Sequence, residues 1–218
     1  MQMTDSMEIV DDPKNEAANQ ITYLMLFTDT NRIDLKLKTI DKQKLPNDSL
    51  TKILLDKDAL FPGDLKSSDE DYWVKKPTQK QFSECCNEFW WVSTYVMKGV
   101  LRQEEMYAKD MLEKPVRDMF LLMLSWQVGI KNNFSINLGS SNKFLKKHID
   151  NDLWKRILIT YPNAELSNIY DSLMEMTDLF HSAAIEIAEE LDYIYNLQEA
   201  QQTKEYLLQR GKEFNNLL

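Results

Sequence analysis

Six charged or aromatic side chains recur at helical spacing in the stretch that follows Thr78. They are Glu84, Glu88, Trp91, Tyr95, Lys98 and Arg102. Because positions three, four and seven apart lie near one another on a helix, this face combines carboxylates, aromatic rings and cations. Such a mixture is typical of a ligand-binding face. Periodicity alone favours another interpretation, in which Trp91 and Tyr95 pack on a neighbouring domain, since most aromatic stripes are core.

Asp34 is the second candidate for chemistry. It lies in the segment 32–37, where Arg32, Asp34 and Lys36 alternate with apolar residues and therefore share one face of a strand. A strand-borne carboxylate that projects into a cleft can serve as a metal ligand or a general base. The pattern alone favours an ordinary solvated strand residue.

The remaining reactive side chains form no recognisable site. His148 and His181 are far apart, and neither has a Cys, His or carboxylate at metal-ligand spacing. Cys85 and Cys86 are neighbours in a helical stretch, so they point in different directions and are predicted to be packing residues, not a disulfide or nucleophiles. The sequence has no nucleophile elbow, Walker loop or dinucleotide-binding glycine pattern.

Composition narrows the function classes. The chain has 218 residues, 43% of them hydrophobic, and a formal net charge of -9. A surface of that sign repels nucleic acid and anionic lipid and suits a cationic small ligand, although solubility alone also explains it. The sequence has two cysteines that are not spaced for a disulfide, and it shows no signal peptide and no apolar run of membrane length. These features indicate a protein of the reducing cytoplasm. Nothing in the sequence sets the oligomeric state.

The N-terminal third is predicted to be a small β region. Residues 1–20 are polar and acidic and predict a loop, 21–37 a β-hairpin, and 53–55 a third strand. Two or three strands make a poor independent fold and leave an exposed sheet edge. A polar connection ends at Pro77, where we place the domain boundary.

From residue 78 the pattern becomes helical and predicts a bundle. Thr78 and Gln81 form a capping box, and Pro115 is placed to begin a third helix. The apolar stretch 116–130 is predicted to be the central helix, the longest helix covers 166–191, and the last covers 198–210 and ends before Gly211. The fold class is therefore α+β, with a partial α/β domain over 1–77 and a helical domain over 78–218.

Eight segments together resemble one protein family, the aminoglycoside 6-adenylyltransferases, which are streptomycin-modifying nucleotidyltransferases. They are Tyr-Leu-Met-Leu-Phe (23–27), Asn-Arg-Ile-Asp-Leu (31–35), Leu-Leu-Asp-Lys-Asp (54–58), Lys-Lys-Pro-Thr (75–78), Cys-Cys-Asn-Glu-Phe-Trp-Trp-Val-Ser (85–93), Lys-Gly (98–99), Pro-Val-Arg-Asp-Met (115–119) and Leu-Ser-Trp (124–126). The resemblance is ordered and runs from about Tyr23 to the C-terminus. It implies a mixed nucleotidyltransferase sheet followed by a helical, substrate-side domain.

The resemblance also implies an activity. A hydroxyl of streptomycin attacks the α-phosphorus of ATP, which yields AMP–streptomycin and pyrophosphate, and three carboxylates hold two Mg²⁺ ions. Asp34 matches the third carboxylate, as metal ligand or general base. Lys98 and Arg102 are assigned to the triphosphate of ATP. The drug side is assigned to Glu88, Trp91 and Tyr95.

Two departures from the family pattern bear on activity. The family begins with a Gly-Ser loop and a pair of aspartates spaced Asp-x-Asp, and neither occurs before Asp34. We therefore expect a shortened chain that is inactive alone, because the missing carboxylates supply much of the catalytic electrostatics. Gln127 stands where the family pattern has His after Leu-Ser-Trp, and glutamine cannot shuttle protons.

Three functions stay open at this point. The chain is a shortened adenylyltransferase, an inactive helical remnant that binds a cationic ligand, or a module whose hairpin pairs with a separate N-terminal half. The upstream reading frame discriminates among them, because an in-frame Gly-Ser loop and Asp-x-Asp would favour the enzyme.

Overall fold

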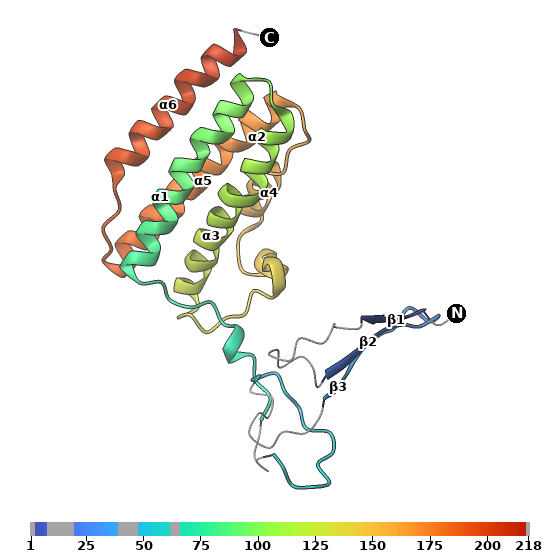
Figure 1. Ribbon diagram of the computed structural model, residues 1–218. Helices are drawn as coiled ribbons and strands as arrows, with labels where there is room; N and C mark the ends of the chain where they lie inside the picture. The colour runs from blue at the N-terminus through green and yellow to red at the C-terminus, as the bar shows by residue number, and fades with distance from the viewer. Residues whose placement is uncertain (1–2, 8–19, 39–47, 62–65, 217–218) are drawn as a thin grey trace, which may run out of the picture. The chain divides into compact units, whose positions relative to one another are not determined.

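The computed structural model describes residues 3–7, 20–38, 48–61 and 66–216 (Figure 1). The chain divides into two compact units, Met1–Ser68 and Asp69–Leu218, and each is described by itself. The division precedes the sequence-based boundary at Pro77, because Val74 already belongs to the helical unit. Its backbone N–H donates to the Ile136 carbonyl at 2.8 Å, and its side chain packs against the core. The functional roles assigned to the two regions stay predictions.

The first unit holds a three-stranded antiparallel sheet. Its strands are β1 (Met3–Met7), β2 (Gln20–Leu26) and β3 (Arg32–Lys38), in the order β1-β2-β3. The hairpin of β2 and β3 is confirmed, and Asp34 lies opposite Leu24 in its register. The described strands are all antiparallel, where the resemblance implied a mixed sheet.

Two sequence-based assignments in this unit were wrong. Met3–Met7, expected to be loop, pairs with β2, because an edge strand is held by backbone hydrogen bonds and tolerates a polar composition. Residues 53–55 form no strand. Leu54 is 88% exposed, and the chain turns just after it, where the Asp56 carboxylate accepts hydrogen bonds from the backbone N–H groups of Leu60 and Phe61.

The second unit is a helical bundle. Its helices are α1 (Gln79–Leu101), α2 (Glu105–Met111), α3 (Arg117–Lys131), α4 (Asn151–Ile159), α5 (Leu166–Leu191) and α6 (Leu197–Asn215). Short 3-10 turns occur at Glu70–Tyr72, Ser140–Asn142 and Leu145–Lys147. The α+β class, with a small sheet before a larger bundle, is confirmed.

Helix α1 is the organising element of the bundle. Its predicted capping box is present: the Gln81 N–H donates to Thr78 Oγ1 at 3.2 Å, and the Thr78 N–H donates to Gln81 Oε1 at 2.8 Å. Its apolar stripe, from Phe82 to Val100, is buried. Helix α1 packs against α2, α3, α5 and α6, so the remaining face of α1 is the part available to a ligand (Figure 1).

Two helix boundaries differ from those expected. Pro115 does not begin a separate helix but lies inside a π-helical turn, Leu112–Val116, that joins α2 to α3. Proline has no backbone N–H to donate, so it cannot complete the regular α-helical hydrogen-bond pattern. The chain therefore forms a wider, π-helical turn around Pro115. Gly211 does not end α6 but lies within it, where a Cβ atom would meet Tyr170 Oη at 2.0 Å. Glycine is there because the Tyr170 ring occupies the space of a side chain.

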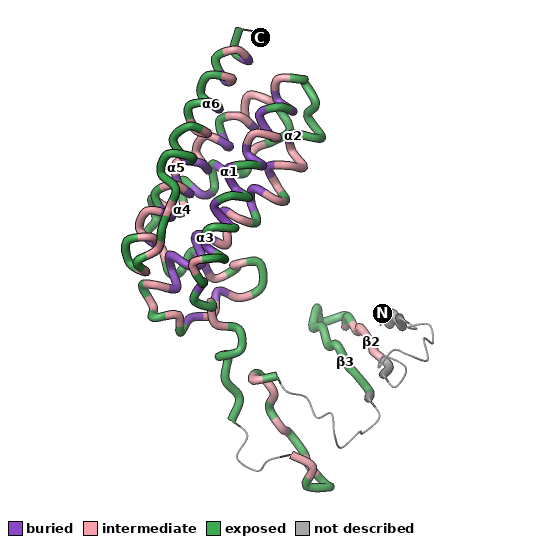
Figure 2. The backbone as a smooth tube through the Cα atoms, turned by 60° about the vertical axis from the view of Figure 1, so that its left-hand side comes forward, coloured by how far each residue is buried: buried purple, intermediate pink, exposed green. Residues whose placement is uncertain are grey.

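The buried residues that the structure describes belong to the helical unit. In the first unit, none of residues 22–37, 48–61 and 66–68 is buried, whereas buried positions run through every long helix of the bundle (Figure 2). Within the described part of the chain, no helix combines the length and apolar character needed to cross a bilayer.

Candidate functional site

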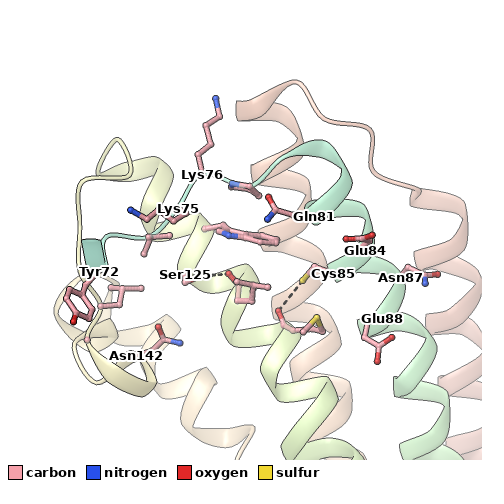
Figure 3. A pocket seen from close by; sticks show the side chains of 17 residues that line it. Tyr72, Lys75, Lys76, Gln81, Glu84, Cys85, Asn87, Glu88, Ser125 and Asn142 are labelled. Atoms are coloured by element: carbon pink, nitrogen blue, oxygen red, sulfur yellow. Dashed lines mark hydrogen bonds between the residues drawn. The ribbon is translucent and has the colours of Figure 1, made fainter. Parts of the chain in front are cut away.

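The helical unit contains a pocket of about 750 Å³ beside the N-terminal half of α1 (Figure 3). Four segments build it: the stretch before α1, α1 itself, α3, and the loop after α3. The lining residues are Tyr72, Val74, Lys75, Lys76, Pro77, Gln81, Glu84, Cys85, Asn87, Glu88, Met119, Leu122, Ser125, Trp126, Leu138, Gly139 and Asn142. Its size suits a small molecule of one or two rings.

The inner surface of the pocket is apolar and firmly held. Trp126 is 5% exposed and supplies the largest ring. The Cys85 thiol is directed at the Met119 carbonyl at 3.5 Å, which ties α1 to α3. Burial raises the pKa of Cys85 to about 12, so the thiol stays protonated and is not a nucleophile.

Charged groups lie around this apolar surface. Glu84 and Glu88 are one helical turn apart on α1, and their side chains project from it beside the pocket (Figure 3). Glu84 forms an exposed ion pair with Lys80 at 3.6 Å. Glu88 has no hydrogen bond or ion pair to any residue that the structure describes. The segment before α1 supplies Lys75 and Lys76.

This arrangement is suited to binding and offers no covalent chemistry. Two carboxylates one turn apart can pair with the guanidinium or ammonium groups of one ligand. The indole of Trp126 offers a flat surface for a sugar or aromatic ring. Asn87 and Asn142 add amide donors and acceptors. The lining carries two carboxylates and two ammonium groups, so the pocket fits a polar small molecule with charged groups better than an apolar one.

The structure separates the residues of the predicted α1 face. Glu84 and Glu88 line the pocket, whereas Trp91 and Tyr95 lie outside it. Trp91 is 60% exposed, and its Nε1 donates to Tyr95 Oη at 2.8 Å, with the ring centroids 6.1 Å apart. Tyr95 is half-buried and packs against the core, so the pair joins an exposed ring to a partly buried one on α1.

Lys98 and Arg102 also lie outside the pocket. Both are exposed near the C-terminal end of α1, where Arg102 is the C-cap residue and its N–H donates to the Lys98 carbonyl at 3.2 Å. Lys98 is ten residues beyond Glu88, which corresponds to about 15 Å along a helix. A ligand held at Glu88 reaches them only if it extends along α1.

Asp34 belongs to the first unit. It lies on β3, and its carboxylate accepts two hydrogen bonds from Arg32, from Nε at 2.9 Å and from Nη2 at 3.2 Å. Its side chain is 46% exposed. The described residues contain no group of three or more His, Cys, Asp or Glu side chains that could hold a metal ion. Asp34 is paired with Arg32 and belongs to no such group. The described residues alone therefore do not fit a magnesium site.

Several pocket residues were not identified from the sequence. Trp126 lies in a helix that is apolar nearly all round, so periodicity assigned it to the core. Lys75 and Lys76 precede the first helical position, in a stretch whose polar composition predicts a connection. One available signal was the resemblance itself, because Lys-Lys-Pro-Thr and Leu-Ser-Trp are two of its eight segments.

Gln127 has a structural contact. Its Nε2 donates to the Glu186 carboxylate, and Lys131 pairs with the same carboxylate at 3.1 Å. The three side chains connect α3 to α5. Gln127 does not line the pocket.

Comparisons with known proteins identify the family of the chain. The family model described as streptomycin adenylyltransferase matches residues 1–210. An aminoglycoside 6-adenylyltransferase of Campylobacter jejuni is 38% identical over 195 residues, which cover 88% of this chain and 67% of that protein. One of Bacillus subtilis is 36% identical over 198 residues, which cover 89% of this chain and 69% of that protein.

A solved structure extends the likeness to the fold. The crystal structure of an aminoglycoside 6-adenyltransferase from Bacillus subtilis superposes with a TM-score of 0.59 at 30% identity, and covers 96% of this chain and 77% of that one. Both units of the chain are therefore included in the match. The chain belongs to the streptomycin adenylyltransferase family.

Proposed function

We propose that the chain is the drug-binding part of an aminoglycoside O-adenylyltransferase of streptomycin type, which acts in antibiotic resistance in the cytoplasm. In the proposed reaction a drug hydroxyl attacks the α-phosphorus of ATP. The new bond joins the drug oxygen to phosphorus, the bond to the β-phosphate oxygen breaks, and pyrophosphate leaves. The hydroxyl proton passes to a base.

One observation carries the proposal: the pocket with Glu84 and Glu88 beside the indole of Trp126. A streptomycin-type drug is a polycation built on saturated rings. Its guanidinium groups suit carboxylates that lie one turn apart, and its rings suit a flat indole. The formal net charge of -9 attracts such a drug from solution.

The remaining residue roles are proposed from the resemblance. Asp34 is the base or metal-binding carboxylate of the sheet. Its carboxylate has to release Arg32 before it can bind a metal ion or accept a proton. Lys98 and Arg102 are assigned to the ATP triphosphate, and Trp91 and Tyr95 extend the drug-binding face along α1. When bound, Mg²⁺ would neutralise phosphate charge. The described residues do not fit such a metal site by themselves.

We further propose that the chain by itself has little adenylyltransferase activity. The motivation is the absence of an Asp-x-Asp pair before Asp34. Incubation with Mg-ATP and streptomycin, with pyrophosphate release as the readout, tests this. Robust turnover would show that the chain supplies the metal-binding carboxylates from other positions.

Drug binding tests the role of the pocket separately from turnover. We expect calorimetric titration of streptomycin into the chain at low salt to show binding that weakens as salt rises. Glu88→Gln should lower the affinity about tenfold, because it removes one charge-assisted contact. Glu190→Gln is the matched control: it removes the same charge from an exposed position of α5 and should leave the affinity unchanged.

Two results would reject the drug pocket. One is the absence of binding heat at millimolar streptomycin. The other is an equal loss of affinity in both variants, which would mean that net charge alone attracts the drug.

A second function is supported by the exposed sheet. On β3, Ile33 is 51%, Leu35 42% and Leu37 50% exposed, and none of residues 22–37 of the hairpin is buried. In the described sheet, β3 pairs along one edge only. An apolar strand with a free edge favours pairing with another chain. The occupant we propose is a separate N-terminal half that carries the Gly-Ser loop and Asp-x-Asp.

Co-expression tests this second function. The N-terminal part of the Campylobacter jejuni relative, ending before the matched region, is produced together with this chain. We expect the two to elute as one complex in size-exclusion chromatography, and Leu35→Lys to abolish it. Separate elution with retained streptomycin binding would identify the chain as an inactive remnant that binds a cationic ligand.

A further inference from the structure

A second pocket, of about 410 Å³, lies on the neighbouring face of α1. It is bounded by α1, by the loop between α5 and α6, and by the first turn of α6. Asn87 lines both pockets, so they flank the same stretch of helix. None of the roles assigned above involves the second pocket.

Aromatic rings form its walls and are fixed in place. Trp90 is 2% exposed, and its Nε1 donates to Tyr195 Oη at 3.1 Å. Tyr195 Oη also bonds His181 Nδ1 at 2.9 Å, and the Tyr195 ring meets the Phe82 ring edge-on at 6.0 Å. The rings are therefore held before any ligand arrives, which lowers the entropic cost of binding.

The pocket has a single charged group at neutral pH, the carboxylate of Glu199. Burial raises the pKa values of Cys86 and Tyr195, and the charge of Glu199 adds to both shifts, so the thiol and the phenol stay neutral. One Glu199 oxygen, Oε2, accepts a hydrogen bond from Asn196 Nδ2 at 3.1 Å. Among the described residues Oε1 has no hydrogen-bond or ion-pair partner, so it is available to a ligand.

We propose that this second pocket binds a planar aromatic cation, such as an arylamidinium or an arylammonium ion. The ring lies against Trp90 and Tyr195, and the cationic group bonds Glu199 Oε1. Aromatic faces attract a cation as well as a flat ring, and the pocket presents no positive side chain to oppose it. Streptomycin, which has no aromatic ring, is not the ligand of this pocket.

A ligand in the second pocket also contacts the α5–α6 loop, which supports the first pocket. Ile194 and Tyr195 belong to the α5–α6 loop, and the Ile194 N–H donates to Gln79 Oε1 at 2.7 Å. The neighbouring Tyr193 Oη donates to the Pro77 carbonyl at 2.6 Å, and Pro77 lines the first pocket. The backbone amide signals of Gln79 and Ile194 therefore report on occupancy.

Three probes of one shape and different charge test the proposal. Benzamidine is the cation, benzamide the neutral control and benzoate the anion. They are titrated into the full chain, and ¹H–¹⁵N NMR follows the Trp90 indole N–H and the amides of Gln79 and Ile194. We expect benzamidine to shift these signals with a millimolar Kd, benzamide to bind about tenfold more weakly, and benzoate to leave them unchanged.

Variants identify the carboxylate. Glu199→Gln keeps the contact with Asn196 and should lower the benzamidine affinity to that of benzamide, whereas Glu190→Gln should leave it at the parent value. Equal binding of all three probes would overturn the proposal, as would parent-like affinity in Glu199→Gln or shifts confined to residues of the first pocket. These outcomes are independent of streptomycin binding.

Discussion

Arg117 donates two hydrogen bonds to the carboxylate of Glu113, from Nε to Oε2 at 2.5 Å and from Nη2 to Oε1 at 3.1 Å. Arg117 is 4% exposed, and its other donors bond the hydroxyl and the carbonyl of Thr160. Its guanidinium carbon lies 3.6 Å from the ring centroid of Tyr161. The pair spans the π-helical turn and connects it to the end of α4. Arg117, part of one family-like segment, is therefore a structural residue of the bundle.

Arg117→Met should strongly destabilise the helical unit. The substitution keeps much of the aliphatic volume but leaves the Glu113 carboxylate with Lys109 alone and the Thr160 carbonyl without its guanidinium donor. Removing one member of a buried ion pair costs about 3 kcal/mol. Urea unfolding followed by circular dichroism measures it. Arg156→Met is the control, because its pair with Glu175 is half-exposed and should contribute less than about 1 kcal/mol; equal losses in both variants would contradict the structural role.

The same cluster predicts a dependence of stability on pH. Burial alone raises the pKa of the Glu113 carboxyl, but hydrogen bonds from Arg117 and Lys109 outweigh it and hold the pKa below the usual value. A carboxyl with a depressed folded-state pKa stabilises the fold above its unfolded pKa, and that contribution is lost as pH falls through the folded value. The stability difference between the parent and Glu113→Gln should therefore shrink below about pH 4.5. Unfolding midpoints from pH 7 to pH 3 test this, and a constant difference would contradict it.

The sequence predicted helices and strands correctly in segments where a single period of apolar residues dominates. The stripe of α1 alternates apolar and polar residues at helical spacing, so its face and its cap were found, and the bounds of α5 were reproduced. The strand Met3–Met7 was missed because backbone pairing, which composition does not reveal, holds it. Gly211 was assigned as a helix end because a glycine that makes room for a distant ring has the same local signature as one that stops a helix.

The candidate site was only partly predictable. Glu88 was found because it falls on a polar face of α1. Trp126 was missed because it lies in a core helix, where a residue that lines a pocket and a residue that packs in the core have the same apolar pattern. Helical spacing fixes a direction around the axis but lets residues several turns apart share it, so Glu88 lines the pocket whereas Trp91 and Lys98, grouped with it in the prediction, lie farther along α1.

Gly211→Ala should destabilise the protein, although alanine is the better helix former. Helix propensity alone predicts a gain of about 1 kcal/mol. The Cβ atom would instead meet Tyr170 Oη at 2.0 Å, and displacing that ring from between α5 and α6 should cost about 1–3 kcal/mol. Thermal unfolding decides the sign. Adding Tyr170→Leu should recover much of the loss, and a stabilised Gly211→Ala would show that the ring moves without cost.

Tyr193→Phe should weaken streptomycin binding while the fold stays intact. The change removes the hydrogen bond to the Pro77 carbonyl, which anchors the segment carrying Lys75 and Lys76. We expect a few-fold loss of affinity by calorimetry and a stability loss of about 1 kcal/mol. Tyr206→Phe, at a 41% exposed position on α6, is the control. Unchanged affinity in Tyr193→Phe would show that the pocket does not depend on this anchor.

Asp34→Asn should abolish activity in a complete enzyme. The composite joins the N-terminal part of the Campylobacter jejuni relative to this chain and should adenylylate streptomycin. Asparagine keeps the size and one acceptor oxygen but loses the charge that binds a cation or accepts the hydroxyl proton. The rate of pyrophosphate release should fall about a hundredfold or more. Stability should change little, because Asp34 is half-exposed and packs against little else.

Two further variants, a charge control on α5 and a change of Arg32, make this test specific to Asp34. Asp171→Asn removes the same charge from an exposed position of α5 and should keep the parental rate. Arg32→Gln should affect the rate far less than Asp34→Asn, because catalysis requires Asp34 to leave that partner. If Asp34→Asn retains a rate within a few-fold of the composite, the carboxylate serves only its pair with Arg32, and the catalytic base lies elsewhere in the enzyme.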